Sequence, residues 1–253
     1  MRIIISPAKK MNTDTNTLPP LGLPVFLEKT EPLLETLRGM SPDQLQRLWK
    51  CSDSLAALNA ERLQYMNLRQ GLTPAILAYE GIQYQYMAPG VFTREQLDYV
   101  QEHLRILSGF YGVLKPFDGV TPYRLEMQAK LPVGSAKDLY GYWGSSLADH
   151  LFEETDCIIN LASKEYSKCI SKYLPKGKRF ITCVFGEEQK GKVVEKGTMC
   201  KMARGEMVRY MAEHSITDPV QLKAFDRLQH RYSPAHSTED MFVFIREKTT
   251  KGD

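Results

Sequence analysis

The sequence has few of the residues that cross-link small secreted proteins or bind zinc. Five cysteines occur among 253 residues, and no two of them form a C-x-x-C pair. Widely spaced cysteines are typical of reduced, buried thiols. The five histidines form no H-E-x-x-H motif. We therefore expect no disulfides, no metal site and no cofactor.

Long apolar runs and a strong net charge are also missing. The first apolar run is three isoleucines, followed by Ser6 and Pro7, and a secretory signal needs about 7–15 apolar residues. No run approaches the ~20 residues of a membrane span. We expect a cytoplasmic protein without a membrane segment, and no sequence feature indicates an obligate protein partner.

What is present is the composition of a globular protein, 43% hydrophobic and 25% charged. Strand and helix patterns alternate without a regular βαβ period, which predicts an α+β (mixed α/β) fold. We expect one compact domain over residues 1–253, with a mixed sheet, flanking helices and a candidate helical subdomain over about 28–110. The predicted strands cover 2–5, 74–79, 157–162, 180–185, 192–196 and 241–246. The predicted helices cover 28–38, segments starting at 41 and at 52 or 53, a segment from Thr93 through Leu107, 164–171 and 199–214.

The small net charge of +3 hides a concentrated basic segment. Residues 160–210 carry 12 basic and five acidic residues, a net charge of +7, whereas the flanking segments are slightly acidic. Two predicted helices carry these cations on one side each. The cations in question are Lys164, Lys168 and Lys172 on the first helix and Lys201, Arg204 and Arg209 on the second. Such faces are either solvated surface or a binding site for a phosphate backbone, and the pattern leaves both open.

Two serines follow short apolar strands. Ser6 comes directly after residues 2–5, and Ser163 comes after residues 157–162. Ligands of α/β sheets collect at the carboxyl ends of strands, and a capping serine places backbone amides near an anion. Plain helix capping explains the same residues. No G-x-S-x-G motif supports a nucleophilic serine.

A strictly alternating segment covers residues 122–128. As a strand, it places Arg124, Glu126 and Gln128 on one face and Leu125 and Met127 on the other. Arg124 and Glu126 either pair with each other or line a polar cleft that meets a phosphate or carboxylate.

A glycine-rich segment ends the helix predicted from Thr93. Residues 103–116 resemble a helix-hairpin-helix DNA-binding element, in which hairpin amides face phosphates. Its glycines, Gly109 and Gly112, are separated by two residues, where the usual element has one. A helix that ends at Gly109, followed by a strand over 111–114, explains the same letters.

Five motifs in this order resemble the YaaA family of peroxide stress response proteins. They are Ile-Ser-Pro-Ala-Lys at 5–9, Leu-Arg-Ile-Leu-Ser-Gly-Phe-Tyr-Gly-Val-Leu-Lys-Pro-Phe-Asp at 104–118, Pro-Tyr-Arg-Leu-Glu-Met at 122–127, Ile-Asn-Leu-Ala-Ser-Lys-Glu-Tyr at 159–166 and Lys-Met-Ala-Arg-Gly at 201–205. The resemblance implies a bacterial cytosolic protein that limits free iron, and with it Fenton damage to DNA. It also implies a "cantaloupe" α/β fold with a helix-hairpin-helix-like element and a positively charged cleft that binds duplex DNA.

Pattern and resemblance together define the candidate site residues. The phosphate-binding candidates are Lys9, Arg105, Ser108, Gly109, Gly112, Lys115, Arg124, Lys137, Lys164, Lys168, Lys201, Arg204 and Arg209. The candidates for catalysis are Glu126, Ser163 and Glu165.

Three functions remain as hypotheses. The first is a stress protein that binds double-stranded DNA, and the second is an enzyme acting on a nucleotide or nucleic-acid base in the same cleft. The third, direct sequestration of iron, lacks a cluster of His and carboxylate ligands at helical spacing. Whether the protein is an enzyme stays open at this stage.

Overall fold

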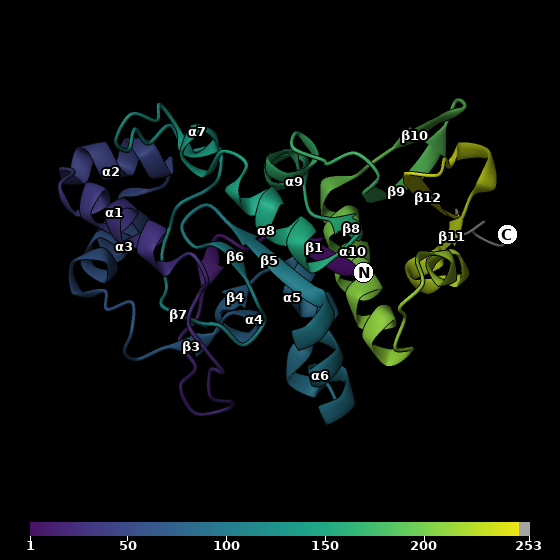
Figure 1. Cartoon of the computed structure of the whole chain (residues 1–253), viewed down its shortest axis with the longest axis horizontal. Coiled ribbons are helices and arrows are strands. Elements are labelled where there is room, and N and C mark those ends of the chain that lie inside the picture. Colours follow the sequence, from purple (N-terminus) through teal and green to yellow (C-terminus); the bar gives the residue numbers. More distant parts are fainter. Residues whose placement is uncertain (248–253) are drawn as a thin grey trace, which may run out of the picture.

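The centre of the molecule is an eight-stranded mixed sheet (Figure 1), seen in a computed structural model that describes residues 1–247. The strands lie in the order β11-β12-β9-β8-β1-β5-β6, and β10 pairs with β9 outside this row. Their bounds are β1 Arg2–Ile5, β5 Leu104–Ser108, β6 Gly112–Leu114, β8 Cys157–Leu161, β9 Arg179–Gln189, β10 Lys192–Val194, β11 His230–Tyr232 and β12 Met241–Arg246. Two small ladders join β2 (Lys10–Met11) with β4 (Tyr79–Glu80) and β3 (Thr73–Pro74) with β7 (Gly119–Val120).

Strand β1 lies in the middle of the sheet because its sequence is apolar on both faces. Ile3, Ile4 and Ile5 are fully buried, as expected for a parallel strand covered on both sides. The strand pairs in parallel with β5 on one side and with β8 on the other, so that Ile3 lies between Leu104 and Ile159.

The strands that follow β1 in the chain first add to one side of it, and the later strands add to its other side. Strands β5 and β6 follow on one flank of β1, whereas β8, β9 and β12 build the other flank. The boundary between β1 and β8 is therefore a topological switch point, where the loops after two parallel strands separate and leave a crevice at their carboxyl ends.

Ten α-helices within residues 1–247 surround the sheet. They are α1 Leu27–Arg38, α2 Pro42–Trp49, α3 Asp53–Tyr65, α4 Ala75–Ala78, α5 Ile82–Met87, α6 Arg94–His103, α7 Leu139–Trp143, α8 Ser146–Glu154, α9 Lys164–Ser171 and α10 Gly197–Glu213. Four short 3-10 segments lie at 89–91, 219–224, 227–229 and 234–236. Helices α1–α3 group at one end of the molecule, far from β11 at the other (Figure 1). No helix in the described part of the chain is long and apolar enough to cross a membrane.

The predicted mixed α/β fold with flanking helices is confirmed, and so are several helix starts. Ser41 and Thr93 each cap a helix through a reciprocal capping box with the glutamine three residues later. Helix α10 buries Ala203, Met207 and Met211, so the predicted apolar side of this helix faces the core.

Two of the predicted elements are wrong. Residues 75–78 form the one-turn helix α4 between two-residue strands, where one strand over 74–79 was expected. The helix from Thr93 ends at His103, so that Leu104 and Leu107 belong to strand β5. In both cases a short apolar run fits a buried helix and a buried strand equally well, and the packing decides.

The expected helix-hairpin-helix over residues 103–116 is also wrong. Strands β5 and β6 flank the glycines and form an antiparallel hairpin, in which Ser108 pairs with Gly112. The described chain does contain a tight helical hairpin elsewhere, because α2 and α3 are joined by only three residues, Lys50 to Ser52. Lys50 makes the turn with a left-handed backbone, φ +47°.

The segment 122–128 is not a strand, because residues 122–126 have no regular secondary structure and residues 127–128 form a turn closed by the hydrogen bond from the Ala129 amide to the Glu126 carbonyl oxygen. Its burial still alternates as predicted, because Tyr123, Leu125 and Met127 are buried whereas Arg124 and Glu126 are partly exposed. The polar side of this segment forms one wall of the site described next.

Candidate functional site

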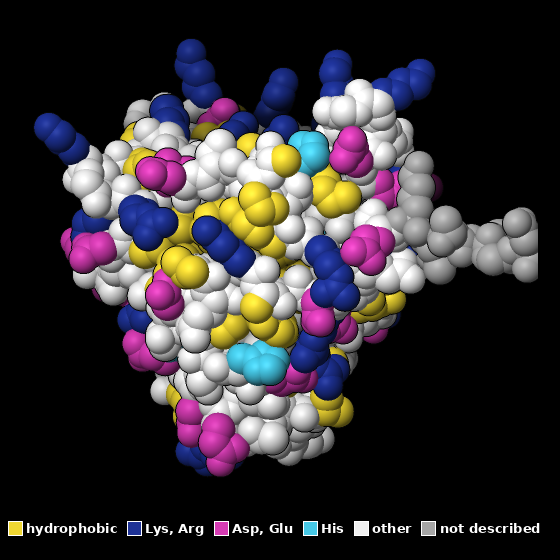
Figure 2. Space-filling view, turned by 90° about the vertical axis from the view of Figure 1, so that its right-hand side faces the viewer, with side chains coloured by type: hydrophobic (Ala, Val, Ile, Leu, Met, Phe, Trp, Pro, Cys, Tyr) yellow, Lys and Arg dark blue, Asp and Glu magenta, His cyan; other side chains and the backbone are white. Residues whose placement is uncertain are grey.

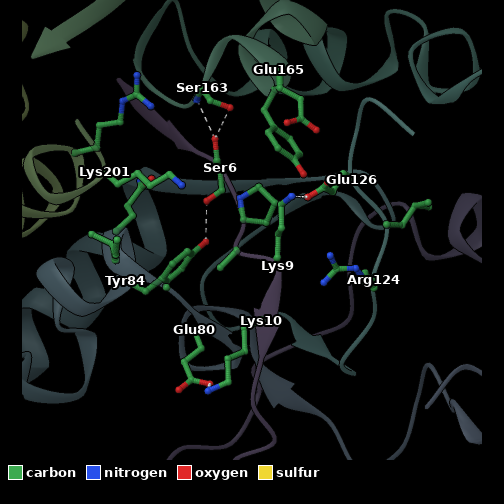
Figure 3. Close-up of a pocket in the computed structure, with 18 of the residues that line it drawn as sticks. Ser6, Lys9, Lys10, Glu80, Tyr84, Arg124, Glu126, Ser163, Glu165 and Lys201 are labelled. Carbon is green, nitrogen blue, oxygen red and sulfur yellow. Dashed lines mark hydrogen bonds and ion pairs between the residues drawn. The ribbon is translucent and has the colours of Figure 1, made fainter. Parts of the chain in front are cut away.

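The site begins where β1 and β8 end, at the topological switch point. The backbone N–H of Ser163 donates to Ser6 Oγ over 2.9 Å, and the Ser6 hydroxyl donates to Ser163 Oγ over 3.2 Å. The hydroxyl of Tyr84 on α5 donates to the carbonyl oxygen of Ser6 over 3.0 Å. Figure 3 shows these three residues at the centre of a cavity. The sequence predicted both serines at strand ends, and the structure joins them directly.

The cavity has a volume of about 580 Å³. Its walls come from the loop after β1, the start of α5, the segment 123–126, the start of α9 and one side of α10. Seven residues predicted from the sequence line it, namely Lys9, Arg124, Glu126, Ser163, Glu165, Lys201 and Arg204. Five of them, Lys9, Arg124, Glu126, Ser163 and Glu165, were expected to converge near strand ends, and all five line this one cavity, whereas Lys164 does not.

Lys9 and Glu126 form an ion pair across the cavity. Lys9 Nζ lies 2.5 Å from Glu126 Oε1, so the glutamate pairs with a lysine from the β1 loop and not with Arg124, two residues away. Arg124 has no ion pair within residues 1–247, and its buried Nε has no hydrogen-bond partner. An unpaired guanidinium in a cavity wall is available for an anionic ligand.

The turn between β5 and β6 supports the segment that carries Glu126. A Cβ on Gly109 would lie 2.7 Å from the carbonyl oxygen of Leu125 and 2.9 Å from the backbone of Glu126. Only glycine allows this close approach. Behind the segment, the buried Tyr123 hydroxyl hydrogen-bonds to Ser108 Oγ over 2.6 Å and to the Tyr79 hydroxyl over 2.8 Å. Gly109 and Ser108 thus position the site from behind.

Three carboxyl groups line the cavity, those of Glu80, Glu126 and Glu165. Burial raises the pKa of Glu165, and the nearby charge of Glu126 raises it further, although the Glu165 carboxylate accepts a hydrogen bond from the Gln128 amide over 3.2 Å. Glu126 is paired with Lys9. A carboxyl group with a raised pKa beside a second carboxyl group is a common feature of acid–base sites.

Helix α10 supplies a cationic wall through an unusually close contact with α5. A Cβ on Gly205 would overlap the carbonyl oxygen of Gln83, so glycine lets the two helices meet. This contact brings Arg204 and Lys201 beside Gln83, which also lines the cavity. Arg204 Nη2 forms an ion pair with Glu195 Oε1 at 3.6 Å. Neither Arg204 Nε nor Gln83 Nε2 has a hydrogen-bond partner.

A second cavity of about 510 Å³ adjoins the first, and both are lined by Arg124 and Glu126. Its other charged residues are all basic, namely Arg47 and Lys50 at the end of α2 and Lys130. None of these three has an ion pair in the part of the chain that the structure describes. The residues that line the two cavities include more basic than acidic side chains.

Four of the residues predicted to bind phosphate are instead buried and contact other parts of the protein. The prediction for these four is wrong. Arg105 is 2% exposed, and its guanidinium pairs with Glu154 at 2.8–2.9 Å. Ser108 is fully buried and accepts hydrogen bonds from the amides of Phe110 and Tyr111. Gly109 packs on the Glu126 segment, and a Cβ on Gly112 would lie 3.0 Å from three core side chains. These residues build the fold behind the site.

Five predicted cations are partly or well exposed but line neither cavity: Lys115, Lys137, Lys164, Lys168 and Arg209. Lys168 lies over the ring of Tyr140 at 3.6 Å. Arg209 pairs with Glu213 at 2.8 Å. On the face shown in Figure 2, basic side chains project from the upper edge and alternate with acidic ones elsewhere.

Gln83 and Tyr84 in the first cavity, and Arg47, Lys50 and Lys130 in the second, were not predicted from the sequence. Gln83 and Tyr84 lie in a short apolar helix without a motif, so no local signal distinguishes them from core residues. The two cations at the end of α2 did carry a signal, since Arg47 and Lys50 are three apart on one helix side. Within residues 1–247, no group of three or more His, Cys, Asp or Glu side chains is arranged to hold a metal ion.

Comparison with known proteins places this geometry in a family. The family model described as peroxide stress protein YaaA matches residues 1–236. The chain is 56% identical over 253 residues to a UPF0246 protein of Lachnoclostridium phytofermentans, and the aligned residues make up 100% of this chain and 99% of the relative. UPF0246 proteins of Agathobacter rectalis and Pediococcus pentosaceus are 55% and 50% identical, over 98% and 99% of this chain and 99% and 100% of the relatives.

Proposed function

Because the chain belongs to the peroxide stress protein YaaA family, we propose that its two cavities form one groove that binds double-stranded DNA through the phosphate backbone. In this proposal, the bound protein helps to limit iron-driven damage to DNA during peroxide stress. The observation that carries it is the surplus of unpaired cations in the second cavity, where four basic residues meet one acidic residue.

The helical hairpin beside this cavity supports the same proposal. Family resemblance implies a helix-hairpin-helix-like element, and we propose that α2 and α3, which are joined by three residues, take this role in place of residues 103–116. Its turn starts at Lys50, whose left-handed backbone reverses the chain. Backbone amides and cations at such a turn suit phosphate contacts that are independent of base sequence.

A salt titration of duplex binding tests the proposal. Each neutralised phosphate contributes a slope of about −0.9 to log K against log salt. We expect Arg47→Ala and Lys130→Ala each to weaken binding and to flatten this slope by roughly one contact. The matched control is Arg94→Ala, which removes an exposed cation of α6, paired with Asp98, that lines neither cavity. Absence of duplex binding at low salt would refute the proposal.

The link to iron is tested in cells. Cells that carry the groove variants in place of the natural protein should lose peroxide survival in proportion to lost DNA affinity, whereas Arg94→Ala should protect fully. Addition of an iron chelator should restore survival of the groove variants, because Fenton chemistry requires the metal. Full protection by variants that no longer bind DNA would separate the stress role from DNA binding.

A second candidate function is an enzyme that acts on a nucleotide or nucleic-acid base. The neighbouring carboxyl groups of Glu126 and Glu165 favour it, because Glu126 is ion-paired with Lys9 and burial raises the pKa of Glu165. Ser163 adds a hydroxyl at the same cavity. Glu126→Gln should abolish turnover and leave DNA affinity nearly unchanged. If cellular protection survives this change, Glu126 has a structural role.

A further inference from the structure

We infer that the floor of the first cavity is a binding site for one phosphate group, formed by Ser6, Ser163, the first turn of α9 and Gln83. This inference rests on the proposed function in one respect, the phosphate-bearing nature of the ligand. It names a different part of the groove from the cationic second cavity. A free nucleotide and a nucleic-acid strand both carry the required group.

The first element of the site is an uncapped helix start. Ser163 occupies the N-cap position of the eight-residue helix α9 with extended backbone angles, but its side chain accepts no capping hydrogen bond. Its hydroxyl oxygen accepts from Ser6 instead. Amides of a first helical turn have no acceptor within the helix and attract anions. In this helix start the Tyr166 amide donates to the Ser163 carbonyl oxygen over 3.0 Å, whereas the amides of Lys164 and Glu165 have no acceptor within the helix, and the cap serine lines the cavity.

The second element is a buried donor without a partner. Gln83 is 7% exposed and lines the same cavity, yet its Nε2 has no hydrogen-bond partner within residues 1–247. Arg204, with an orphan Nε, lines the cavity as well. Buried polar groups without partners destabilise a protein, so native structures contain few of them. Unpaired donors around one cavity indicate a ligand that supplies acceptor oxygens.

The donor set selects the chemistry of the ligand. A hydroxyl, helix amides, a carboxamide, a guanidinium and the ammonium of Lys201 surround the floor, and together they offer more donors than one carboxylate engages. A phosphate presents three or four acceptor oxygens. Each carboxylate that lines the cavity already has a donor: Glu80 pairs with Lys10, Glu126 pairs with Lys9, and Glu165, in the first turn of α9, accepts from the Gln128 amide.

Titration of the full-length protein with inorganic phosphate, followed by calorimetry, tests the inference. We expect saturable binding to the natural protein and roughly tenfold weaker binding to Ser163→Ala and to Gln83→Leu, because each loses one hydrogen bond to a charged group. Ser52→Ala is the matched control, since Ser52 is also an N-cap serine without a capping bond but lies at α3, outside both cavities. Unaltered affinity in both cavity variants would overturn the inference.

Two further measurements keep the test interpretable. Gln83→Glu preserves the shape of the side chain and adds a negative charge, so a folded Gln83→Glu protein that still binds phosphate normally would contradict the site.

A nucleoside 5′-monophosphate and a short duplex then identify the source of the phosphate: the ligand whose affinity falls in Ser163→Ala is the one that reaches the floor. If duplex DNA binds but neither phosphate nor nucleotide does, this inference fails and the proposed function stands. If inorganic phosphate binds but duplex does not, the proposed function fails and the site stands.

Discussion

Charged side chains gather at both ends of the parallel strands, which we call the amino edge and the carboxyl edge of the sheet. The two edges differ in how these charges are paired. At the amino edge, Arg2 pairs with Glu102 and Glu154, and the buried Arg105 pairs with Glu154. At the carboxyl edge, Arg124, Arg204 and Gln83 each keep a buried nitrogen without a partner. Paired charges at the first edge stabilise the fold, whereas unpaired donors at the second are available to a ligand.

The amino edge also shows how the pairing overcomes burial. Burial opposes the charge of Glu154, but Arg105 and Arg2 outweigh it, so that the pKa of the Glu154 carboxyl is lowered. The guanidinium of Arg105 additionally donates to the carbonyl oxygens of Gln101, Glu102 and Leu104. Every side of this arginine is satisfied by the protein, which leaves no contact for a phosphate.

The largest expected effect comes from breaking the amino edge. Glu154→Ala leaves Arg105 charged and buried, and removal of one partner from a buried pair costs about 3–5 kcal/mol. Urea unfolding of Glu154→Ala and of Glu153→Ala, the exposed neighbour on the same helix, measures this loss. Similar free energies of unfolding for the two variants would contradict the structural role of the amino edge.

Asp118 is the exception at the amino edge, because its buried carboxyl group has no ion pair within residues 1–247. Burial raises its pKa from 3.8 to about 6. A carboxyl group whose pKa is raised in the folded state contributes most stability at low pH, and this contribution is lost as the pH rises from about 4 to 6. Asp118→Asn should therefore raise the free energy of unfolding by at most about 3 kcal/mol at pH 8.

The pH dependence distinguishes this explanation from a general packing effect. The gain in Asp118→Asn should shrink toward zero near pH 4, where the natural aspartate is protonated in the folded state. The asparagine oxygen can still accept the hydrogen bond that the Lys115 amide donates to Asp118 Oδ2 over 2.8 Å. A gain that stays constant from pH 4 to 8 would rule out the titration of Asp118 as its cause.

The next largest effect on stability concerns α10, which forms one wall of the first cavity at the carboxyl edge. Gly205→Ala places a methyl group against the Gln83 carbonyl and forces α10 away from α5, and overpacking of this kind costs about 1–3 kcal/mol. Gly197→Ala is the control in the same helix, because a Cβ there meets no atom within 4 Å. Thermal unfolding compares the two. Gly205→Ala should also weaken ligand binding, since it moves Arg204 and Lys201 relative to Gln83.

These cases show what the sequence alone could predict. The buried strand Ile3–Ile5 and the strand before Ser163 follow from short apolar runs, and their carboxyl ends placed Lys9, Ser163 and Glu165 in one region. The side of segment 122–128 that carries Glu126 followed from its alternation. These positions depend on local pattern and on the general rule for strand ends.

The roles of Arg105 and Gly109 could not be predicted in this way. Arg105 lies in one of the motifs that resemble the YaaA family, but its partner Glu154 is 49 residues away along the chain. A local sequence pattern does not indicate a contact over that separation. The letters around Gly109 fit a turn between helices as well as a turn between strands. The close approach of Gly109 to the Glu126 backbone decides its role, and it depends on tertiary packing.

The smallest expected change in stability belongs to Arg124, and it is the sharpest test of the comparison between the two edges. Arg124 has no ion pair within residues 1–247 and an orphan Nε, so Arg124→Ala should alter the free energy of unfolding by less than about 0.5 kcal/mol. Because Arg124 lines both cavities, the same variant should lose affinity for duplex DNA and for phosphate-bearing ligands. Arg105→Ala should behave in the opposite way, with a large loss of stability that leaves no direct binding defect in the protein that remains folded. Urea unfolding and duplex titration of both variants measure the four quantities. A destabilised Arg124→Ala protein would mean that the carboxyl edge, too, uses its charges to hold the fold.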